Sequence, residues 1–147
     1  MPPRSEKLRA RPQSPAQRPA DRKDTMKWEF KNGIPIYLQI IDQIKRQIVS
    51  GELAPGSRIP AVRDLAQEAG VNPNTMQRAL TQLEQEGLLY TQRTSGRFVT
   101  QEEEIMKQTR MQLSDEYIAE LFKHLQQLGL SRDDIVKAVS EWRDNSK

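Results

Sequence analysis

Apolar residues recur at helical spacing along much of the chain from residue 35 onwards. In the first such stretch, isoleucines are four residues apart, at Ile36, Ile40, Ile44 and Ile48. This spacing predicts an amphipathic helix over about residues 35–50, ended by Gly51. The loop ELAPGSRIP follows it. The loop is rich in Pro and Gly and has room for one short strand around Arg58 and Ile59.

Two shorter amphipathic helices come next, separated by a tight turn. The first, AVRDLAQEA, is entered at Pro60 and closed by Gly70, which can take the positive φ angle that the turn requires. The second begins with Asn72 as its cap and Pro73 in the first helical position. Its narrow apolar stripe comprises Met76, Ala79, Leu80 and Leu83. This arrangement predicts a helix-turn-helix, in which the first helix braces the second.

After Gly87 the pattern changes to short runs of aromatic and β-branched residues. The runs LLYTQ and RFVT are separated by RTSG, which predicts a β-hairpin. From residue 101 the chain is helical again, and a polar stretch, QEEEIMKQTRMQL, leads to the helix SDEYIAELFKHLQQLG. A second helix, SRDDIVKAVSEWRDN, has Ser131 as its cap and Asp134 three residues on, a variant of the capping box. These two helices predict a helical hairpin.

The elements together predict a mainly α fold with a small β-hairpin. We expect a winged helix-turn-helix domain over residues 26–100 and a short helical module over residues 101–147. Residues 1–25 contain five prolines and one large aliphatic residue after Met1, too little apolar area to offset chain entropy. We expect a disordered basic tail, or a non-native extension if translation begins at Met26. A basic arm that touches phosphate is a third option.

The composition excludes several classes of function. The 147-residue chain has no Cys and one His, which excludes a disulfide scaffold, thiolate-zinc sites and cysteine nucleophiles. It has no nucleophile–base pair and no Gly-rich phosphate loop, and His124 is interpreted as a surface or interface residue. We therefore expect no enzyme, metal or cofactor. No apolar run is long enough for a signal peptide or a membrane span, so a cytoplasmic, soluble protein without a membrane partner is expected.

The net charge of +3 is unevenly distributed. Residues 1–25 hold seven Lys/Arg against three Asp/Glu, and the remaining residues have a net charge of −1. Residues 58–97 carry five basic and four acidic groups, whereas residues 102–147 carry seven and ten. The C-terminal end is therefore not expected to lie against phosphate, and any DNA binding depends on where the charges of residues 58–97 lie.

The outer face of the second helix of the helix-turn-helix carries Asn74, Arg78, Thr81 and Gln85, with Gln77 at the border, where a solvated helix usually has Glu/Lys pairs. Asn and Gln offer a paired donor and acceptor to adenine, and Arg reaches both acceptors of guanine. The free N–H groups of the helix N-terminus suit phosphate. On the brace helix, Arg63 would lie against the DNA backbone. The hairpin with Arg93 and Arg97 becomes a wing that follows the duplex into the minor groove.

Two other interpretations of this surface stay open. An outer face of Asn, Thr, Gln and Arg also occurs on helices that are merely solvated. Some winged helices bind protein instead of DNA, and such a module would show little salt dependence and would not shift duplex DNA. Brace, turn, amide-rich helix and basic hairpin in this order favour DNA.

The apolar stripes of the C-terminal helices indicate a partner surface. Core packing between the two helices explains part of the pattern, but two short helices cannot bury both stripes against each other alone. We therefore expect a homodimer. Its candidate interface residues are Ile118, Leu121, Phe122, Leu125, Leu128, Ile135, Val139 and Trp142.

Residues 34–100 resemble the DNA-binding domain of the GntR transcription regulators. The motifs that carry the resemblance are IVSGELAPGSRIPAVRDLA, GVNPNTMQRAL, LEQEGLL and GRFV. The short C-terminal part resembles the YtrA-type branch, in which a small helical module dimerises the protein. The resemblance implies a sequence-specific transcription regulator, a repressor, that binds an inverted-repeat operator in double-stranded DNA as a homodimer. Relatives of this type often control transporter genes. The sequence identifies neither the operator nor a small-molecule effector.

The resemblance also implies roles for single residues. Arg63 matches a brace-helix arginine that contacts DNA in the family, and Gly96 matches a wing-tip glycine. Recognition-helix positions near bases and phosphates are matched by Asn72, Asn74, Thr75 and Gln77, with Arg78 beside them. There are two departures from the family pattern. Thr94 stands where a second glycine is common, and Pro73 stands where some relatives have a base-reading side chain, which shifts the expected readout to Asn74, Gln77 and Arg78.

Overall fold

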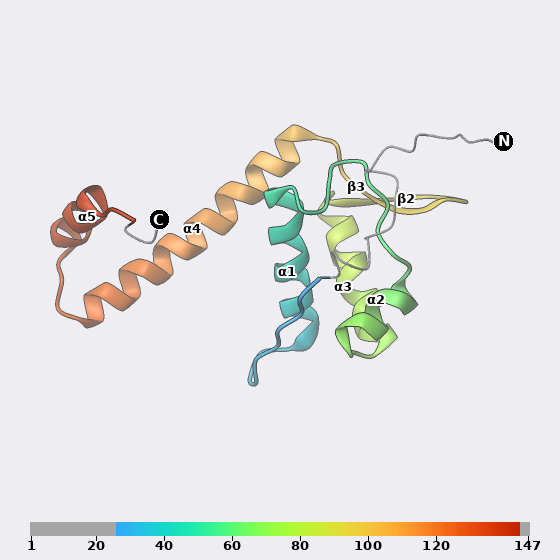
Figure 1. Cartoon of the computed structure of the whole chain (residues 1–147), viewed down its shortest axis with the longest axis horizontal. Coiled ribbons are helices and arrows are strands. Elements are labelled where there is room, and N and C mark those ends of the chain that lie inside the picture. Colours follow the sequence, from blue (N-terminus) through green and yellow to red (C-terminus); the bar gives the residue numbers. More distant parts are fainter. Residues whose placement is uncertain (1–25, 145–147) are drawn as a thin grey trace. The chain divides into compact units, whose positions relative to one another are not determined.

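The structure is a computed structural model that describes residues 26–144 (Figure 1). The predicted tail, residues 1–25, lies outside this range. The elements in chain order are α1 (Ile36–Ser50), α2 (Val62–Ala69), α3 (Pro73–Gln85), β2 (Leu89–Gln92), β3 (Gly96–Val99), α4 (Glu103–Gln127) and α5 (Arg132–Glu141). The mainly α fold class with one small hairpin is confirmed.

The chain divides into two compact units, with the boundary between Thr109 and Arg110. This boundary lies inside α4, nine residues beyond the predicted end of the DNA-binding domain at residue 100. The functional division into residues 26–100 and 101–147 stays a prediction. The two units are described separately below.

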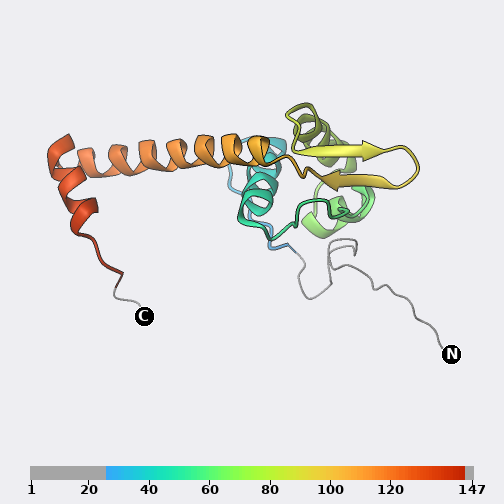
Figure 2. The same ribbon diagram turned by 90° about the horizontal axis from the view of Figure 1, so that it is seen from above.

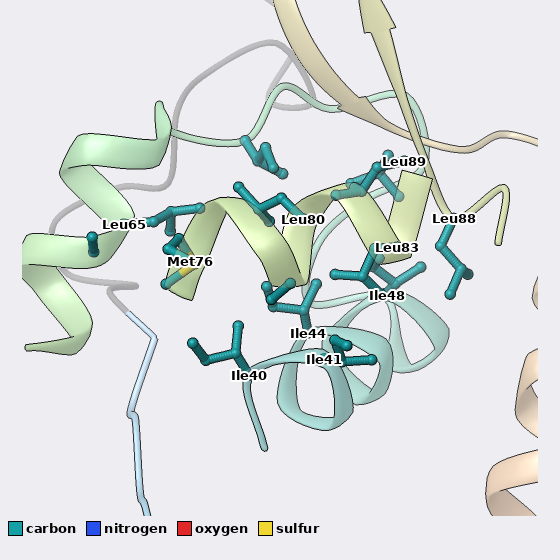
Figure 3. Close-up of a cluster of buried hydrophobic side chains, with 14 residues drawn as sticks. Ile40, Ile41, Ile44, Ile48, Leu65, Met76, Leu80, Leu83, Leu88 and Leu89 are labelled. Carbon is teal, nitrogen blue, oxygen red and sulfur yellow. The ribbon is translucent and has the colours of Figure 1, made fainter. Parts of the chain in front are cut away.

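In the first unit, α1, α2 and α3 pack around one apolar core (Figure 3). The stripe predicted on α3 is its buried face, since Met76, Ala79, Leu80 and Leu83 are all inaccessible to solvent. Facing them from α1 are Ile40, Ile41, Ile44 and Ile48, and Leu65 and Ala66 of α2 are buried in the same core. Burying one side of α3 completely leaves its polar side outward.

Local signals fix the turn between α2 and α3. Gly70 follows α2 with a φ angle of +72°, and its N–H bonds back to the carbonyls of Ala66 and Gln67, as a left-handed C-terminal residue does. The side chain of Asn72 accepts a hydrogen bond of 2.7 Å from the N–H of Asn74, and Pro73 occupies the first helical position. The predicted cap, turn and start of the helix are confirmed.

Strands β2 and β3 form the predicted hairpin, in which they pair antiparallel (Figure 2). Leu89 pairs with Val99, and both side chains are buried. Tyr90 pairs with Phe98, and their rings stack with centroids 5.7 Å apart. Arg58 forms an isolated bridge to Phe98, which corresponds to the short strand expected around residues 58–59.

An extended segment that precedes α1 is tied to that helix by two glutamine side chains. The amide of Gln43 donates to the carbonyl of Glu29 at 2.7 Å and accepts from the Glu29 N–H at 3.3 Å. Gln39 does the same for Lys31, at 2.9 and 2.8 Å. Each glutamine amide thus pairs with both the N–H and the carbonyl of one residue, as the backbone of a neighbouring β-strand would. Phe30, which lies between the two tethered residues, and Trp28, which precedes them, pack against the core.

The chain was expected to be helical again from residue 101, with a polar stretch that leads to an amphipathic helix. The structure has one continuous helix of 25 residues here, α4, that begins at Glu103. No Gly or Pro interrupts residues 101–113, and Glu103 and Glu104 lie in the first turn, where negative charge is favourable. Ile105 and Met106 pack against the core of the first unit, so this end of α4 is held by packing.

In the second unit, Ser131 and Asp134 form the predicted capping box. The Asp134 N–H donates to Ser131 Oγ and the Ser131 N–H donates to Asp134 Oδ2, both at 3.1 Å. Ile135, one residue further along α5, is fully buried. Among the described residues, no helix combines the length and the apolar character needed to cross a membrane.

Candidate nucleic-acid interface

The outer face of α3 presents a group of polar side chains to solvent. Asn74, Gln77 and Arg78 are exposed, while Thr75 and Thr81 are half-buried. The amide nitrogen of Gln77 donates to Thr81 Oγ1 at 3.1 Å, one turn along the helix. These residues lie together on one surface, as predicted. The amides, hydroxyls and guanidinium can offer donors and acceptors to base edges.

Asn72 differs from these residues because its side chain is already engaged. Its oxygen caps α3 by accepting the Asn74 N–H, which holds the side chain at the start of the helix, while its amide nitrogen can still donate to an external acceptor. A role for Asn72 near phosphate stays a prediction, and its observed role is to start α3. Arg78 is engaged in another way, since its guanidinium carbon lies 3.6 Å from the centroid of the Tyr37 ring on α1.

The wing places its two predicted arginines in different surroundings. Arg93 is exposed in the turn between the strands, and a hydrogen bond of 3.0 Å from the Ser95 N–H to the Gln92 carbonyl closes that turn. Arg97 is half-buried on β3, and its Nε lies 3.3 Å from Oε1 of Glu84 on α3. Arg93 can reach a ligand directly, whereas Arg97 is held by an acidic partner, and its contact with DNA stays a prediction.

Arg58 belongs to this surface, although sequence reasoning assigned it no role. It is exposed, it bridges to Phe98 of the wing, and its guanidinium lies against Gly96. A Cβ atom on Gly96 would come within 3.0 Å of Arg58 Nε. Gly96 also has a φ angle of +107°, so both its backbone and its lack of a side chain suit this contact. The basic residue was visible in the sequence, but its contact with the wing was not.

Around α3 and the wing, the acidic side chains of Glu84 and Glu86 are paired, whereas several of the described arginines are not. Within residues 26–144, the exposed Arg58, Arg63 and Arg93 take part in no ion pair. The carboxylate of Glu84 is paired with Arg97, and that of Glu86 lies 2.8 Å from Nζ of Lys45 on α1. The surface around α3 is therefore more basic than its sequence composition indicates.

Glu86 illustrates how this neutralisation works. Partial burial raises the pKa of Glu86, but hydrogen bonds from Lys45 and Gln82, together with the charge of Lys45, outweigh it and lower the pKa below its ordinary value. The carboxylate is therefore ionised and bound to α1 at neutral pH. It acts as a tie between α1 and the end of α3.

The second unit carries the candidate dimer residues, and the structure separates them into two groups. Ile135 is fully buried within one chain, Phe122 and Leu125 are half-buried, and Arg132 lies over the Phe122 ring at 5.7 Å. The other group is exposed and comprises Ile118, Leu121, Leu128, Val139 and Trp142. Leu128 is 74% exposed and Trp142 is 71% exposed. So many exposed large apolar side chains on one small unit indicate a surface that another molecule covers.

Comparisons with known proteins agree with this geometry. Residues 36–99 match the family described as bacterial regulatory proteins, gntR family. The HTH-type transcriptional regulator YhcF of Bacillus subtilis (strain 168) is 34% identical over 116 residues, which cover 79% of this chain and 96% of YhcF. The HTH-type transcriptional repressor YtrA of the same strain is 39% identical over 71 residues, 48% of this chain and 55% of YtrA.

A solved structure supports the fold over a similar length. A GntR family transcriptional regulator from Listeria monocytogenes matches with a TM-score of 0.69 and 30% sequence identity, covering 78% of this chain and 100% of its own. The part of this chain that matches the Listeria structure, and the 116 residues that match YhcF, are both longer than the family match over residues 36–99. The likeness therefore extends beyond the helix-turn-helix and the wing.

Proposed function

The chain belongs to the gntR family of bacterial regulatory proteins, and we propose that it is a repressor that binds an inverted-repeat operator as a homodimer. It is a DNA-binding transcription regulator and not an enzyme, and its likeness to YtrA supports the YtrA-type branch. In this proposal, residues 26–100 bind DNA and residues 101–147 hold two copies together. A link to transporter genes stays a prediction from family resemblance.

One observation carries the DNA-binding part of the proposal. The apolar side of α3 is completely buried, while Asn74, Gln77 and Arg78 project outward from its first two turns. A helix held in this way can enter the major groove with its N-terminal half, where side chains of these types read base edges. The proposed base-reading segment is residues 73–82, with Thr75 and Thr81 beside the exposed side chains.

The arginines around α3 supply the attraction to phosphate. Arg63 projects from the brace helix, and Arg58 and Arg93 project from the wing region. Without acidic partners among the described residues, each can neutralise a phosphate and release its counterion. Such contacts position the protein on the duplex but carry no sequence information. Sequence preference would then come from Asn74, Gln77 and Arg78.

The homodimer rests on the exposed apolar side chains of the second unit. Leu121, Leu128 and Trp142 are too exposed in a single chain to be core residues. Two copies that cover these side chains with each other would bury them and form a symmetric pair. Twofold symmetry of the protein would then require an inverted-repeat operator, with half-sites one helical turn or a multiple of it apart.

Two experiments test this function. Selection of bound duplexes from a random pool with the purified full chain should return an inverted repeat. Titration of the selected duplex at several salt concentrations should give a log–log slope on the order of −5, which corresponds to about three phosphates for each of two subunits. If no duplex is selected, or if the slope is near zero, the chain does not act through DNA and the protein-binding winged helix becomes the better interpretation.

A further inference from the structure

Arg78 is held from outside its own helix. Its guanidinium carbon lies 3.6 Å from the centre of the Tyr37 ring, well within the distance at which a cation and an aromatic face attract each other. Tyr37 is in the first turn of α1 and packs, half-buried, against the core cluster. The ring is thus a supported platform, and the exposed Arg78 side chain lies on it.

Stacking leaves the hydrogen-bonding capacity of the guanidinium unused. The attraction to an aromatic ring involves the flat face of the guanidinium, whereas its N–H groups point outward in the plane. Within residues 26–144, no hydrogen bond or ion pair takes up these N–H groups. Arg78 therefore keeps a complete set of donors in a plane that Tyr37 determines.

We propose that Tyr37 is a positioning residue for base recognition. By holding the guanidinium flat against its ring, Tyr37 aims the paired N–H groups of Arg78 at the two acceptors of a guanine in the major groove. This inference rests on the proposed function, because it requires α3 to enter that groove. It goes further in placing one determinant of sequence preference on α1, outside the helix-turn-helix.

The neighbouring side chains have other supports, which makes the effect of Tyr37 separable. Gln77 is held by Thr81 on the same helix, and Asn74 contributes its backbone N–H to the Asn72 cap. Neither interaction involves Tyr37. Loss of the ring should therefore change the preference at the base pair that Arg78 reads and leave the other positions of the half-site as they are.

The test compares purified full-length variants in selections from a random duplex pool. Tyr37→Phe keeps the ring, Tyr37→Leu removes it but keeps an apolar side chain of similar bulk, and Arg78→Ala removes the guanidinium. We expect Tyr37→Phe to keep the wild-type preference. Tyr37→Leu should relax the same base pair as Arg78→Ala and weaken binding to the selected site roughly two- to tenfold. In the Arg78→Ala background, Tyr37→Leu should have no further effect on binding.

Three outcomes would overturn the inference. The first is a Tyr37→Leu variant that keeps the wild-type preference at the base pair relaxed by Arg78→Ala. The second is a double variant whose loss of affinity is the product of the two single losses. The third is failure of the wild type to select any duplex, which would overturn the proposed function as well.

If Tyr37→Leu does not fold, Tyr37→Met takes its place. The thermal midpoint of each variant is measured beside its base preference.

Discussion

Arg97 of strand β3 is paired with Glu84 near the end of α3, with 3.3 Å between Nε and Oε1. The other oxygen of the same carboxylate accepts a hydrogen bond of 2.6 Å from Thr91 Oγ1 on β2. One acidic side chain thus joins both strands of the wing to the proposed recognition helix. It also places a negative charge beside the surface that we propose faces phosphate, and so reduces the attraction that Arg97 could exert.

Glu84→Gln should therefore strengthen binding to non-specific DNA. The neutral amide can still accept from Thr91, but it no longer neutralises Arg97. With Arg97 available to phosphate, the slope of log affinity against log salt concentration should become steeper by about 0.9 for each subunit. Glu86→Gln is the matched control, because it removes the same charge but its partner Lys45 is on α1. Equal slopes for the two variants would mean that only net charge matters and that Arg97 stays away from DNA.

Arg63→Ala should weaken binding to every sequence by the same factor. Arg63 is exposed on the brace helix and has no ion pair among the described residues, so its charge is free to contact the phosphate backbone. Its loss should reduce the salt slope by about 0.9 for each subunit and leave the selected sequence unchanged. Arg46→Ala serves as the control, since Arg46 on α1 is paired with Asp42 at 2.9 Å. If Arg63→Ala impairs only the selected site, Arg63 reads a base.

Leu121→Asp should convert the proposed homodimer into monomers. Leu121 is 40% exposed in the single chain, so the substitution should leave the chain folded but introduce a charge into the apolar surface of the second unit. Burying an unpaired carboxylate should weaken self-association roughly tenfold or more. Phe122→Asp should do the same but also disturb the contact with Arg132. Sedimentation velocity distinguishes the states, with Lys123→Asp, on the opposite face of α4, as the control that should remain dimeric.

The fold of the first unit could be predicted because its signals act over a few residues. Asn72 caps the start of α3, and Gly70 ends α2 with hydrogen bonds to carbonyls three and four residues before it. Apolar spacing correctly identified the buried faces of α1 and α3. The start of α4 at Glu103 agrees with the expectation that the chain is helical again from residue 101, where no Gly or Pro would end a helix before residue 113.

The candidate site could be predicted only in part. The outward position of Asn74, Gln77 and Arg78 follows directly from the buried stripe on the same helix. In contrast, the contacts of Arg78 with Tyr37 and of Arg97 with Glu84 join residues that are far apart in the sequence. A single sequence contains no spacing signal for such pairs. Sequence analysis therefore identified the cations but not the partners that determine which of them are free.

Glu86 should make the stability of the first unit depend on pH in the acid range. Its pKa is lowered in the folded chain by the interactions with Lys45 and Gln82, which outweigh the opposing effect of burial. A lowered folded-state pKa means that the stabilisation is complete above the ordinary glutamate pKa of about 4.3 and is lost as the pH falls through the folded-state value. Glu86→Gln should cost less than about 1 kcal/mol at neutral pH.

Urea unfolding of the wild type and of Glu86→Gln at a series of pH values tests this dependence. The difference between the two should shrink as the solution is acidified below the ordinary glutamate pKa. Glu52→Gln, a substitution at an exposed residue in the loop after α1, is the control and should show no such difference. A gap between Glu86→Gln and the wild type that stays constant through the acid range would contradict the assigned pair.

Gln43 should be important for docking the segment before α1. The residue is 9% exposed, and its side chain makes both hydrogen bonds to the backbone of Glu29. Gln43→Leu keeps the approximate shape but leaves a partly buried N–H and a carbonyl without partners, which should lower the free energy of unfolding by about 1–3 kcal/mol. Gln39→Leu, which removes the equivalent bonds to Lys31 in an exposed setting, should cost less.

Fluorescence can separate loss of this docking from general destabilisation. Trp28 packs against the core and stacks on Phe30 with ring centroids 6.1 Å apart, and the second tryptophan of the chain, Trp142, can be removed as Trp142→Phe. In that background, Gln43→Leu should shift the emission of Trp28 to longer wavelength at denaturant concentrations where the circular dichroism of the helices is unchanged. If emission and circular dichroism change together, the segment is part of the cooperative core, and its attachment does not depend on the glutamine.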